Sequence, residues 1–326
     1  MKPARVIVVG VGHMGRLHAQ KIAERARAGD PVALVGVSDA DPERMEEVAR
    51  ELSTRAETSP RALFADADAA VIAVPTVAHF EICSAALEAG LDVLVEKPIA
   101  ANLGEADALV ALSKRLGRVL QVGHQEWFNA AMGVVRKWIT RPRFAEIHRL
   151  GQFSARSTDV DVVRDLMIHD IEILQQLLRD EPERVDAVGV PVITDHVDIA
   201  NARLTFPGAC VANLTASRVS ATPMRKFRLF QRDAYFSIDF LDQKAALFRR
   251  VYPEDGSAPR IEFEDLKTDP GDALVAQLQL FLDATRTRGA QRADGERGVT
   301  GAEGAAALRT ALRVIEAMPP LDDGLP

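Results

Sequence analysis

A glycine-rich turn close to the first residue constrains the fold of this chain more than any other stretch. An apolar run at residues 6–9 leads into Gly10, Gly12 and Gly15, and a helix-like sequence follows. In this G-x-G-x-x-G pattern the first glycine allows a tight strand-to-helix turn, the second lets the backbone approach a pyrophosphate, and the third lets the helix pack close to the strand. Free backbone N–H groups and the helix dipole favour anionic phosphates there. The pattern predicts a dinucleotide site with contacts from Gly10, Gly12, His13, Met14 and Gly15.

Composition narrows the classes of function. The chain has 326 residues, 47% hydrophobic and 27% charged, as expected for a soluble protein with two cores. Its net charge of −7 argues against a nucleic-acid partner or an anionic membrane surface. Cys83 and Cys210 lack metal-ligand spacing, so we expect no metal site and a reducing compartment. Because a strand-like run begins soon after Met1 and Pro75 interrupts the best apolar stretch, we expect no signal peptide, no membrane span and a cytoplasmic protein.

Short apolar runs alternate with helix-like segments through the first half of the chain. The runs after the glycine turn lie at 32–37, 69–74, 93–95 and 119–122, and amphipathic helices are expected up to residue 27, near 77–89 and near 104–116. This α/β order predicts a Rossmann-type, doubly wound parallel sheet covered on both faces. Ligands of such sheets bind beyond the carboxyl ends of the strands. The polar residues at those ends are Asp39, Thr76, Lys97 and His124.

Asp39 is the candidate residue for choosing the cofactor. It lies 24 residues after Gly15 (39 − 15 = 24), near where an acidic side chain binds the ribose hydroxyls of NAD. A carboxylate there would repel the additional phosphate of NADP, so we expect NAD. The alternative is that Asp39 only caps the helix that starts near Pro42, although Asp41 is better placed as that cap.

The second half has the pattern of an α+β domain. One long helix is expected at 161–178, on which Asp165 and His169 lie one turn apart on the same face. A strand is expected at 146–153, and period-two alternation at 210–216 and 236–240, with turns at 206–209 and 232–233, predicts a largely antiparallel sheet. One face of this sheet would pack on its own helices, including segments near 272–288 and 301–318. Apolar residues on the open face indicate a partner subunit.

The change of pattern after His124 divides the chain into two predicted domains. Residues 1–124 form the dinucleotide-binding domain, and residues 125–326 form a domain for substrate binding and oligomerisation.

Several short motifs together resemble the glucose-fructose oxidoreductase/inositol dehydrogenase (Gfo/Idh/MocA) family. They are the glycine turn, Ala73-Val74-Pro75-Thr76 with His79, Glu96-Lys97-Pro98, and Asp165 with His169-Asp170. The resemblance covers nearly the whole chain, and Glu96-Lys97-Pro98 is its most specific motif. It implies an NAD-dependent oxidoreductase acting on a CH–OH group and a homodimer or homotetramer packed sheet to sheet. The implied cofactor contacts are Pro75, Thr76, His79, Glu96 and Lys97.

Three longer stretches resemble a narrower group of that family, the bacterial UDP-N-acetylglucosamine 3-dehydrogenases. They are residues 121–130 (QVGHQEWFNA), 157–174 (STDVDVVRDLMIHDIEIL) and 196–206 (HVDIANARLTF). The resemblance implies oxidation of the 3-hydroxyl of a nucleotide-activated amino sugar, with a PLP-dependent aminotransferase converting the 3-keto product for lipid A synthesis. Trp127 and Ala130 stand where this group is expected to have Arg and Pro, which puts any contact of that arginine in question.

The chemistry of alcohol oxidation assigns roles to three residues. The reaction requires a nicotinamide that accepts a hydride, a base for the hydroxyl proton, and a cation or donor that stabilises the oxygen. Lys97 would supply the cation. His169 is the candidate base, because an imidazole titrates near neutral pH, and Asp165 would orient it. Either Lys97 or His169 could take the proton, directly or through water.

Three further residues have two interpretations each. His79 either closes over the nicotinamide or caps a helix. His124 and Asn129 either line the substrate site or only hold the domain junction.

A nucleotide sugar carries a diphosphate, whose charge needs neutralising. Residues 218–232 contain five cations and no acid, namely Arg218, Arg225, Lys226, Arg228 and Arg232. These cations either contact the diphosphate, Arg218 foremost, or protect an edge strand from pairing with another sheet. By resemblance alone, Arg156 and Asp159 are further candidates for substrate contact.

Two other functions are compatible with these residues. One is a dehydrogenase of the same family that acts on a free sugar or polyol. The other is a non-catalytic NAD-binding sensor or assembly protein, which would have no need for both Lys97 and His169. The sequence leaves open the direction of the reaction, whether NAD is recycled in place, and whether the oligomer is a dimer or a tetramer.

Overall fold

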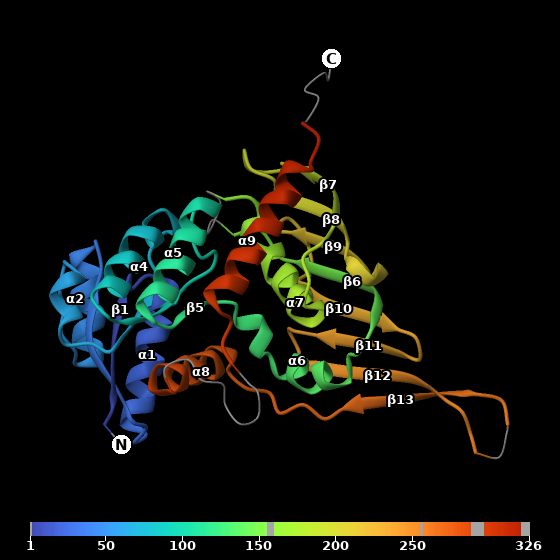
Figure 1. Cartoon of the computed structure of the whole chain (residues 1–326), viewed down its shortest axis with the longest axis horizontal. Coiled ribbons are helices and arrows are strands. Elements are labelled where there is room, and N and C mark those ends of the chain that lie inside the picture. The colour runs from blue at the N-terminus through green and yellow to red at the C-terminus, as the bar shows by residue number, and fades with distance from the viewer. Residues whose placement is uncertain (1, 155–159, 255–256, 288–296, 321–326) are drawn as a thin grey trace. The chain divides into compact units, whose positions relative to one another are not determined.

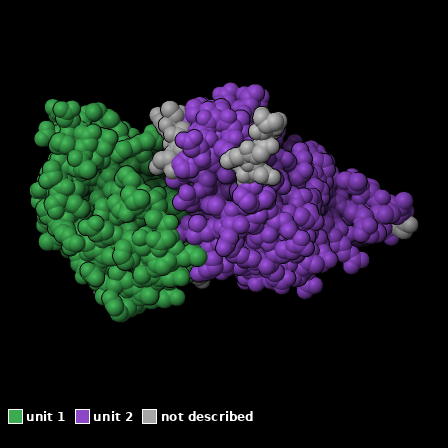
Figure 2. All heavy atoms as spheres, turned by 90° about the horizontal axis from the view of Figure 1, so that it is seen from above, with its two compact units in different colours: residues 1–124, 274–305 green, residues 125–273, 306–326 purple. Residues whose placement is uncertain are grey.

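The computed structural model describes residues 2–154, 160–254, 257–287 and 297–320 (Figure 1). The backbone forms two compact units, which Figure 2 colours separately. The first unit contains residues 1–124 and 274–305, and the second contains residues 125–273 and 306–326.

The division of the chain differs from the sequence-based one in its C-terminal part. A unit boundary does lie after His124, but the predicted second domain, 125–326, loses residues 274–305 to the first unit. The reason is the apolar face of helix α8 (Ala273–Thr287), from which Leu278, Phe281 and Leu282 pack into the core of the first unit. The chain therefore returns to the nucleotide-binding sheet before it ends.

The first unit contains the predicted parallel sheet. Its strands are β1 (Ala4–Val9), β2 (Val32–Ser38), β3 (Ala69–Ile72), β4 (Asp92–Val95) and β5 (Leu120–Val122), in the order β2-β1-β3-β4-β5. All neighbouring strands pair in parallel. Besides α8, the helices are α1 (His13–Arg27), α2 (Pro42–Leu52), α3 (Arg61–Phe64), α4 (His79–Glu88) and α5 (Leu103–Leu116). The Rossmann fold expected from the alternating pattern is confirmed.

A returning segment covers the β5 edge of this sheet. The Val122 amide donates to the Val299 carbonyl at 2.9 Å, and Gln121 forms an antiparallel bridge with Thr300. The Gln277 side chain, from α8, donates to the Val122 carbonyl at 3.1 Å. These contacts hold the end of β5, from which the chain continues to His124, and they satisfy backbone groups that an open edge would leave unpaired.

The second unit is built on a sheet of eight strands. They are β6 (Pro142–Leu150), β7 (Arg184–Val190), β8 (Ile199–Thr205), β9 (Val211–Ser217), β10 (Met224–Gln231), β11 (Ala234–Asp239), β12 (Lys244–Val251) and β13 (Arg260–Leu266). Their order is β13-β12-β11-β10-β6-β9-β8-β7, and only β6 and β9 pair in parallel. The largely antiparallel sheet with helices is therefore confirmed.

One face of this sheet is covered by α6 (Ala130–Val135), α7 (Ile168–Leu178) and α9 (Gly301–Glu316), as Figure 1 shows. The core beneath them contains Ile171 and Leu174 of α7 together with Phe227 and Phe236 of the strands. In β9 the alternation was correctly predicted, because Ala212, Leu214 and Ala216 are all buried. Helix α9 begins in the first unit and ends in the second.

The other face of the sheet carries a row of aromatic side chains. Phe144, Phe230, Tyr235, Phe248 and Phe263 come from five successive strands, and neighbouring ring centroids lie 4.5 to 5.6 Å apart. Phe263, at the end of the row, is 56% exposed. The row forms an apolar strip on the face opposite the helices, because in β6, β10, β11 and β12 its members alternate with the buried residues.

The long helix expected at 161–178 is not regular. A π-helical turn at Val163–Met167 precedes α7, so Asp165 lies in the π-helical turn and His169 in the first turn of the α-helix. A wider turn contains an additional residue, a feature that often marks functional sites. The period-3.6 pattern of apolar residues did not reveal this π-helical turn.

Candidate active site

The glycine turn has the geometry that a dinucleotide requires. Gly10 has a φ of 82°, and a Cβ at Gly15 would lie 1.7 Å from the Gly10 carbonyl oxygen, so both positions require glycine. At Gly12, by contrast, a Cβ would meet no heavy atom of the described residues within 4 Å. Helix α1 begins at His13 without a side-chain cap and without an acid in its first turn. Open space beside an uncapped helix N-terminus fits a pyrophosphate.

Asp39 lies at the glycine turn, as predicted for a ribose-binding acid. Its side chain accepts a hydrogen bond from the Val11 amide at 2.6 Å, and the Arg44 guanidinium contacts both of its oxygens. Burial would raise the pKa of Asp39, but the hydrogen bonds from Arg44, Asp41 and Val11 lower it below its usual range. The helix cap is Asp41, which accepts from the Arg44 amide, so the alternative role of Asp39 as that cap is wrong.

His79 lies between two loops and does not cap a helix. It is 1% exposed, and its ring nitrogens lie 2.9 Å from the carbonyl oxygens of Val74 and Pro98. No side-chain cap is formed at the start of α4. Burial lowers the pKa of His79, so the ring is neutral at physiological pH. A neutral ring has one N–H and can donate to only one of these carbonyl oxygens, so His79 lies between the loops after β3 and β4, beside Lys97, whose peptide bond to Pro98 is cis.

The loop after β3 contributes the predicted residues Pro75 and Thr76. Pro75 is exposed and leads into a 3-10 turn at Thr76–Ala78, in which Thr76 is half-buried. Both residues lie beyond the carboxyl end of β3, where ligands of parallel sheets bind.

Glu96 is held from two sides. Its Oε1 lies 2.8 Å from Nε2 of the fully buried His18, on α1. A Cβ at Gly123 would lie 2.7 Å from Glu96 Oε2, so the carboxylate packs directly against this glycine. The described contacts of Glu96 are thus internal to the first unit, and they fix the start of the loop that carries Lys97.

Lys97 and His124 follow neighbouring strands, β4 and β5, and interact electrostatically. Lys97 is half-buried and His124 is fully buried. Burial, together with the Lys97 charge, lowers the pKa of His124 to about 3, although Glu303 acts in the opposite direction. The His124 imidazole, near Lys97, is therefore neutral at physiological pH.

In the second unit, Asp165 and His169 are both half-buried, as candidates for contact with a substrate should be. The start of this segment is fixed by Asp161, whose carboxylate accepts from the Arg164 amide at 2.9 Å and from the Arg164 side chain. Asp170, the residue after His169, is held by a buried ion pair instead.

Sequence reasoning missed a buried ion-pair network beside His169. Arg149 of β6 donates to both oxygens of Asp170, at 2.9 and 2.7 Å, and to Glu126 at 2.8 Å. Glu126 also accepts from Arg225 at 2.9 Å. Two-point guanidinium–carboxylate pairing is strongly directional, so it fixes the orientation of α7 on the sheet. The only sequence signal was an arginine at an otherwise apolar, inward position of β6.

Asn129 holds the second unit together. Its side-chain oxygen caps α6 by accepting from the Ala131 amide at 3.1 Å, and its side-chain nitrogen donates to the Phe240 carbonyl at 3.1 Å. Because it is only 6% exposed, the described contacts favour the structural interpretation over substrate contact. Trp127, which stands where the narrower group is expected to have Arg, packs beside a cation. The Arg136 guanidinium lies 5.5 Å from the centre of the Trp127 ring.

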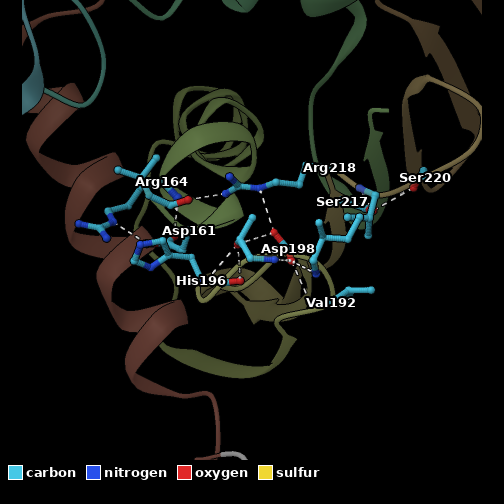
Figure 3. Close-up of polar contacts among 12 residues, drawn as sticks. Asp161, Arg164, Val192, His196, Asp198, Ser217, Arg218 and Ser220 are labelled. Carbon is cyan, nitrogen blue, oxygen red and sulfur yellow. Dashed lines mark hydrogen bonds and ion pairs between the residues drawn. The ribbon is translucent and has the colours of Figure 1, made fainter. Parts of the chain in front are cut away.

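Arg218 is also held by internal contacts (Figure 3). It is 5% exposed, donates to the Val160 carbonyl, and lies 3.7 Å from Asp198. Asp198 in turn accepts hydrogen bonds from three successive amides, at Val192, Ile193 and Thr194. Burial would raise the pKa of Asp198, but these amides lower it far below its usual range. Arg218 thus anchors the chain just before Asp161, while Arg156 and Asp159 lie outside the described residues.

The other cations at 225–232 have carboxylate partners. The pairs are Arg225 with Glu126, Lys226 with Asp239, Arg228 with Glu146, and Arg232 with Asp233. The edge-strand explanation is wrong, because β10 lies between β11 and β6 inside the sheet. Lys226 pairs with Asp239 of the neighbouring strand β11 and Arg228 pairs with Glu146 of β6, so cross-strand pairing accounts for these two cations.

A parallel nucleotide-binding sheet, a glycine turn open to a pyrophosphate and an acid beside it define a dinucleotide-binding protein. Residues 4–124 match the oxidoreductase family with an NAD-binding Rossmann fold, and residues 113–236 match the GFO/IDH/MocA C-terminal domain. The chain belongs to the Gfo/Idh/MocA family, as an NAD-dependent oxidoreductase acting on a CH–OH group.

Two curated relatives and one solved structure illustrate the similarity. UDP-N-acetylglucosamine 3-dehydrogenase of Acidithiobacillus ferrooxidans is 40% identical over 90% of this chain and 92% of its own. The structure of that enzyme, GnnA, aligns with a TM-score of 0.88 and 38% identity over 98% of both chains. Myo-inositol dehydrogenase Hyg17 of Streptomyces leeuwenhoekii is 33% identical over 56% of this chain and 58% of its own. Among the described helices, none combines the length and apolar character that a membrane crossing needs.

Proposed function

We propose that this protein oxidises the 3-hydroxyl of UDP-N-acetylglucosamine with NAD and so forms a 3-keto sugar nucleotide. The observation that carries this proposal is the 40% identity, over 92% of its length, to a relative named for that reaction. It is supported by the presence of Lys97, Asp165 and His169, the three residues to which alcohol oxidation is assigned here.

The residues of this chain would divide the chemistry as follows. NAD, when bound, accepts the hydride from the sugar carbon. Lys97 stabilises the negative charge that develops on the hydroxyl oxygen, while His169 accepts the hydroxyl proton and Asp165 orients it. His124, kept neutral by burial and by Lys97, contributes a hydrogen bond rather than a proton.

The remaining predicted contacts have supporting roles in this proposal. His79 and Glu96 position the loops after β3 and β4, which would place Pro75, Thr76 and Lys97 against the cofactor. Arg218 holds the segment that precedes Asp165, so it would act on the substrate through that segment.

The rival function is oxidation of a free sugar or polyol, which the similarity to a myo-inositol dehydrogenase favours. The test is to incubate the purified protein and NAD separately with UDP-N-acetylglucosamine, N-acetylglucosamine and myo-inositol, and to record the absorbance of reduced nicotinamide. We expect a signal with the sugar nucleotide only. A faster reaction with either free compound would replace the proposal, and binding of NAD in calorimetry without turnover of any compound would favour the sensor function.

We also propose a second copy of this chain as the partner of the open sheet face. The row from Phe144 to Phe263 is apolar and continuous across five strands, and its end, Phe263, is 56% exposed. Replacing Phe263 by Arg should reduce the oligomer mass in light scattering, whereas Leu116→Arg, on α5 of the first unit, should not. Equal masses for all three proteins would refute this interface.

The product suggests the reaction that follows. A 3-keto sugar nucleotide is a substrate for a PLP-dependent aminotransferase, so we propose such an enzyme as the next step, leading to a 3-amino sugar for lipid A. The two cysteines are buried and unpaired, which supports a reducing, cytoplasmic setting.

A further inference from the structure

His18 and Glu96 form a buried pair that joins two elements of the first unit. Nε2 of His18, on α1, lies 2.8 Å from Oε1 of Glu96, which directly follows β4. His18 is fully buried, and Glu96 is 9% exposed. Because a carboxylate only accepts hydrogen bonds, the hydrogen of this pair is on His18 Nε2. The pair therefore ties α1 to the start of the loop after β4.

The imidazole of His18 is unfavourable as a core side chain. Its Nδ1 is buried and has no hydrogen-bond partner among the described residues, and burial of a polar atom in that state costs free energy. The fully buried neighbours on α1, Ala19 and Ile22, are apolar. An apolar side chain would fill the position of His18 with less loss of stability. The contact with Glu96 therefore explains this histidine better than packing does.

The two ends of the contact belong to two parts of the predicted cofactor site. His18 lies in the helix whose uncapped N-terminus stands beside the open space at the glycine turn, where a pyrophosphate fits. Glu96 directly precedes Lys97, the proposed cation of the reaction. The Glu96 carboxylate also packs against Gly123, the residue before His124. A small movement of α1 would thus be transmitted to the loop that carries Lys97.

We propose that His18 is a positioning residue for Lys97, and that its pair with Glu96 couples occupation of the pyrophosphate site to the placement of the Lys97 ammonium. His18 is buried, so it acts through Glu96 and not on the reacting atoms. Such positioning matters because misplacement of a catalytic group by about 1 Å can lower a rate about 10²-fold. This inference rests on the proposed role of Lys97 in the oxidation.

The first test measures the reactivity of Lys97 in the absence of any sugar. The native protein and its variants are labelled with limiting acetic anhydride, and acetylated Lys97 is quantified by mass spectrometry against the exposed Lys114 of α5. Labelling is repeated with ADP-ribose, at concentrations at which calorimetry shows it bound. ADP-ribose supplies the pyrophosphate but has no nicotinamide ring to cover Lys97. In the native protein it should lower the labelling of Lys97 about fivefold, a typical coupling between two sites.

Three variants separate positioning from stability. His18→Leu should label more at Lys97 than the native protein and should not respond to ADP-ribose, because the link to Glu96 is lost. His18→Gln, whose amide N–H can still reach Glu96, should respond as the native protein does. Ile22→Ala is the matched control, one turn further along α1 and fully buried, and it should lower the melting temperature while retaining the response. If His18→Leu does not fold, His18→Met takes its place, because a flexible thioether fills irregular space.

The second test is kinetic. His18→Leu should lower kcat for the proposed oxidation about 10²-fold and leave the affinity for NADH within about threefold, and His18→Gln should restore most of kcat. The proposal is overturned if ADP-ribose does not change Lys97 labelling in the native protein, if the response persists in His18→Leu, or if Ile22→Ala loses it equally. Because labelling requires no sugar, failure of the proposed oxidation would leave the labelling result readable.

Discussion

The Arg149 guanidinium and the Asp170 carboxylate form a two-point ion pair, at 2.7 and 2.9 Å, between strand β6 and helix α7. Both side chains are almost completely buried. Because Asp170 directly follows His169, the pair that fixes α7 on the sheet also fixes the candidate base.

Removal of one partner should therefore be costly. Arg149→Met would leave the Asp170 carboxylate buried without its donor, which costs about 3–5 kcal/mol. The free energy of unfolding in urea measures this loss. Arg228→Ala is the control, because it breaks a half-exposed pair with Glu146 and should cost about 1 kcal/mol or less. Similar losses for both variants would show that Arg149 does not fix α7.

Substitution by alanine should affect cofactor binding at one glycine of the turn and stability at another. Gly12→Ala should leave the melting temperature unchanged, because φ at Gly12 is −62° and the new methyl group has free space, but it should weaken NADH binding at least about tenfold by occupying pyrophosphate space. Gly15→Ala should lower stability by about 1–3 kcal/mol, because its Cβ would overlap the Gly10 carbonyl. Calorimetry and thermal melts distinguish the two. Full NADH affinity in Gly12→Ala would argue against pyrophosphate at this position.

Buried neutral histidines should make the folded state lose stability as the pH falls, even at pH values above those at which carboxylates titrate. Since the pKa of His124 is lowered to about 3, the unfolded chain binds more protons below pH 6.5, and the stability due to neutral His124 is lost as the pH falls. The loss between pH 7 and pH 5 should be about 2 kcal/mol for this residue. His79, whose pKa is lowered too, acts in the same direction.

Urea unfolding of His124→Asn at pH 7 and at pH 5 checks this prediction. The variant should lose about 2 kcal/mol less than the native protein over that interval. His196→Asn, at an exposed position, should retain the native loss. An unchanged pH dependence in His124→Asn would mean that His124 is charged or accessible in the folded state.

Substitution of the candidate catalytic residues should affect turnover more than binding. His169→Asn should lower kcat about 10²- to 10⁴-fold, as loss of a general base does, and should remove the acid limb of the pH profile. Lys97→Met should lower kcat while retaining that limb if His169 takes the proton. Steady-state kinetics from pH 5 to 9 distinguish the roles, with His196→Asn as an active control. An acid limb that persists in His169→Asn would assign the proton to Lys97.

The sequence predicted those features that depend on local patterns. The glycine turn, the buried strands and the positions of Asp39 and Lys97 at strand ends all follow from residues close together in the chain. The alternation in β9 showed which side of the second sheet is buried for the same reason.

Features that depend on distant partners could not be predicted in this way. Arg149 and Asp170 are 21 residues apart, and nothing local links them. The pattern of β10 did not show that it lies inside the sheet, where neighbouring strands supply acids for its cations. Likewise, an amphipathic helix such as α8 shows that it has an apolar face but not which core receives it.

The most direct test of the proposed reaction follows the hydrogen on the sugar carbon. UDP-N-acetylglucosamine carrying deuterium only at carbon 3 is incubated with the protein and NAD, and the reduced cofactor is analysed by mass spectrometry. We predict that the deuterium appears in the reduced nicotinamide and that the sugar nucleotide becomes a 3-keto compound. Reduced cofactor without deuterium, or an unchanged sugar nucleotide under conditions in which the protein binds NAD, would contradict the account.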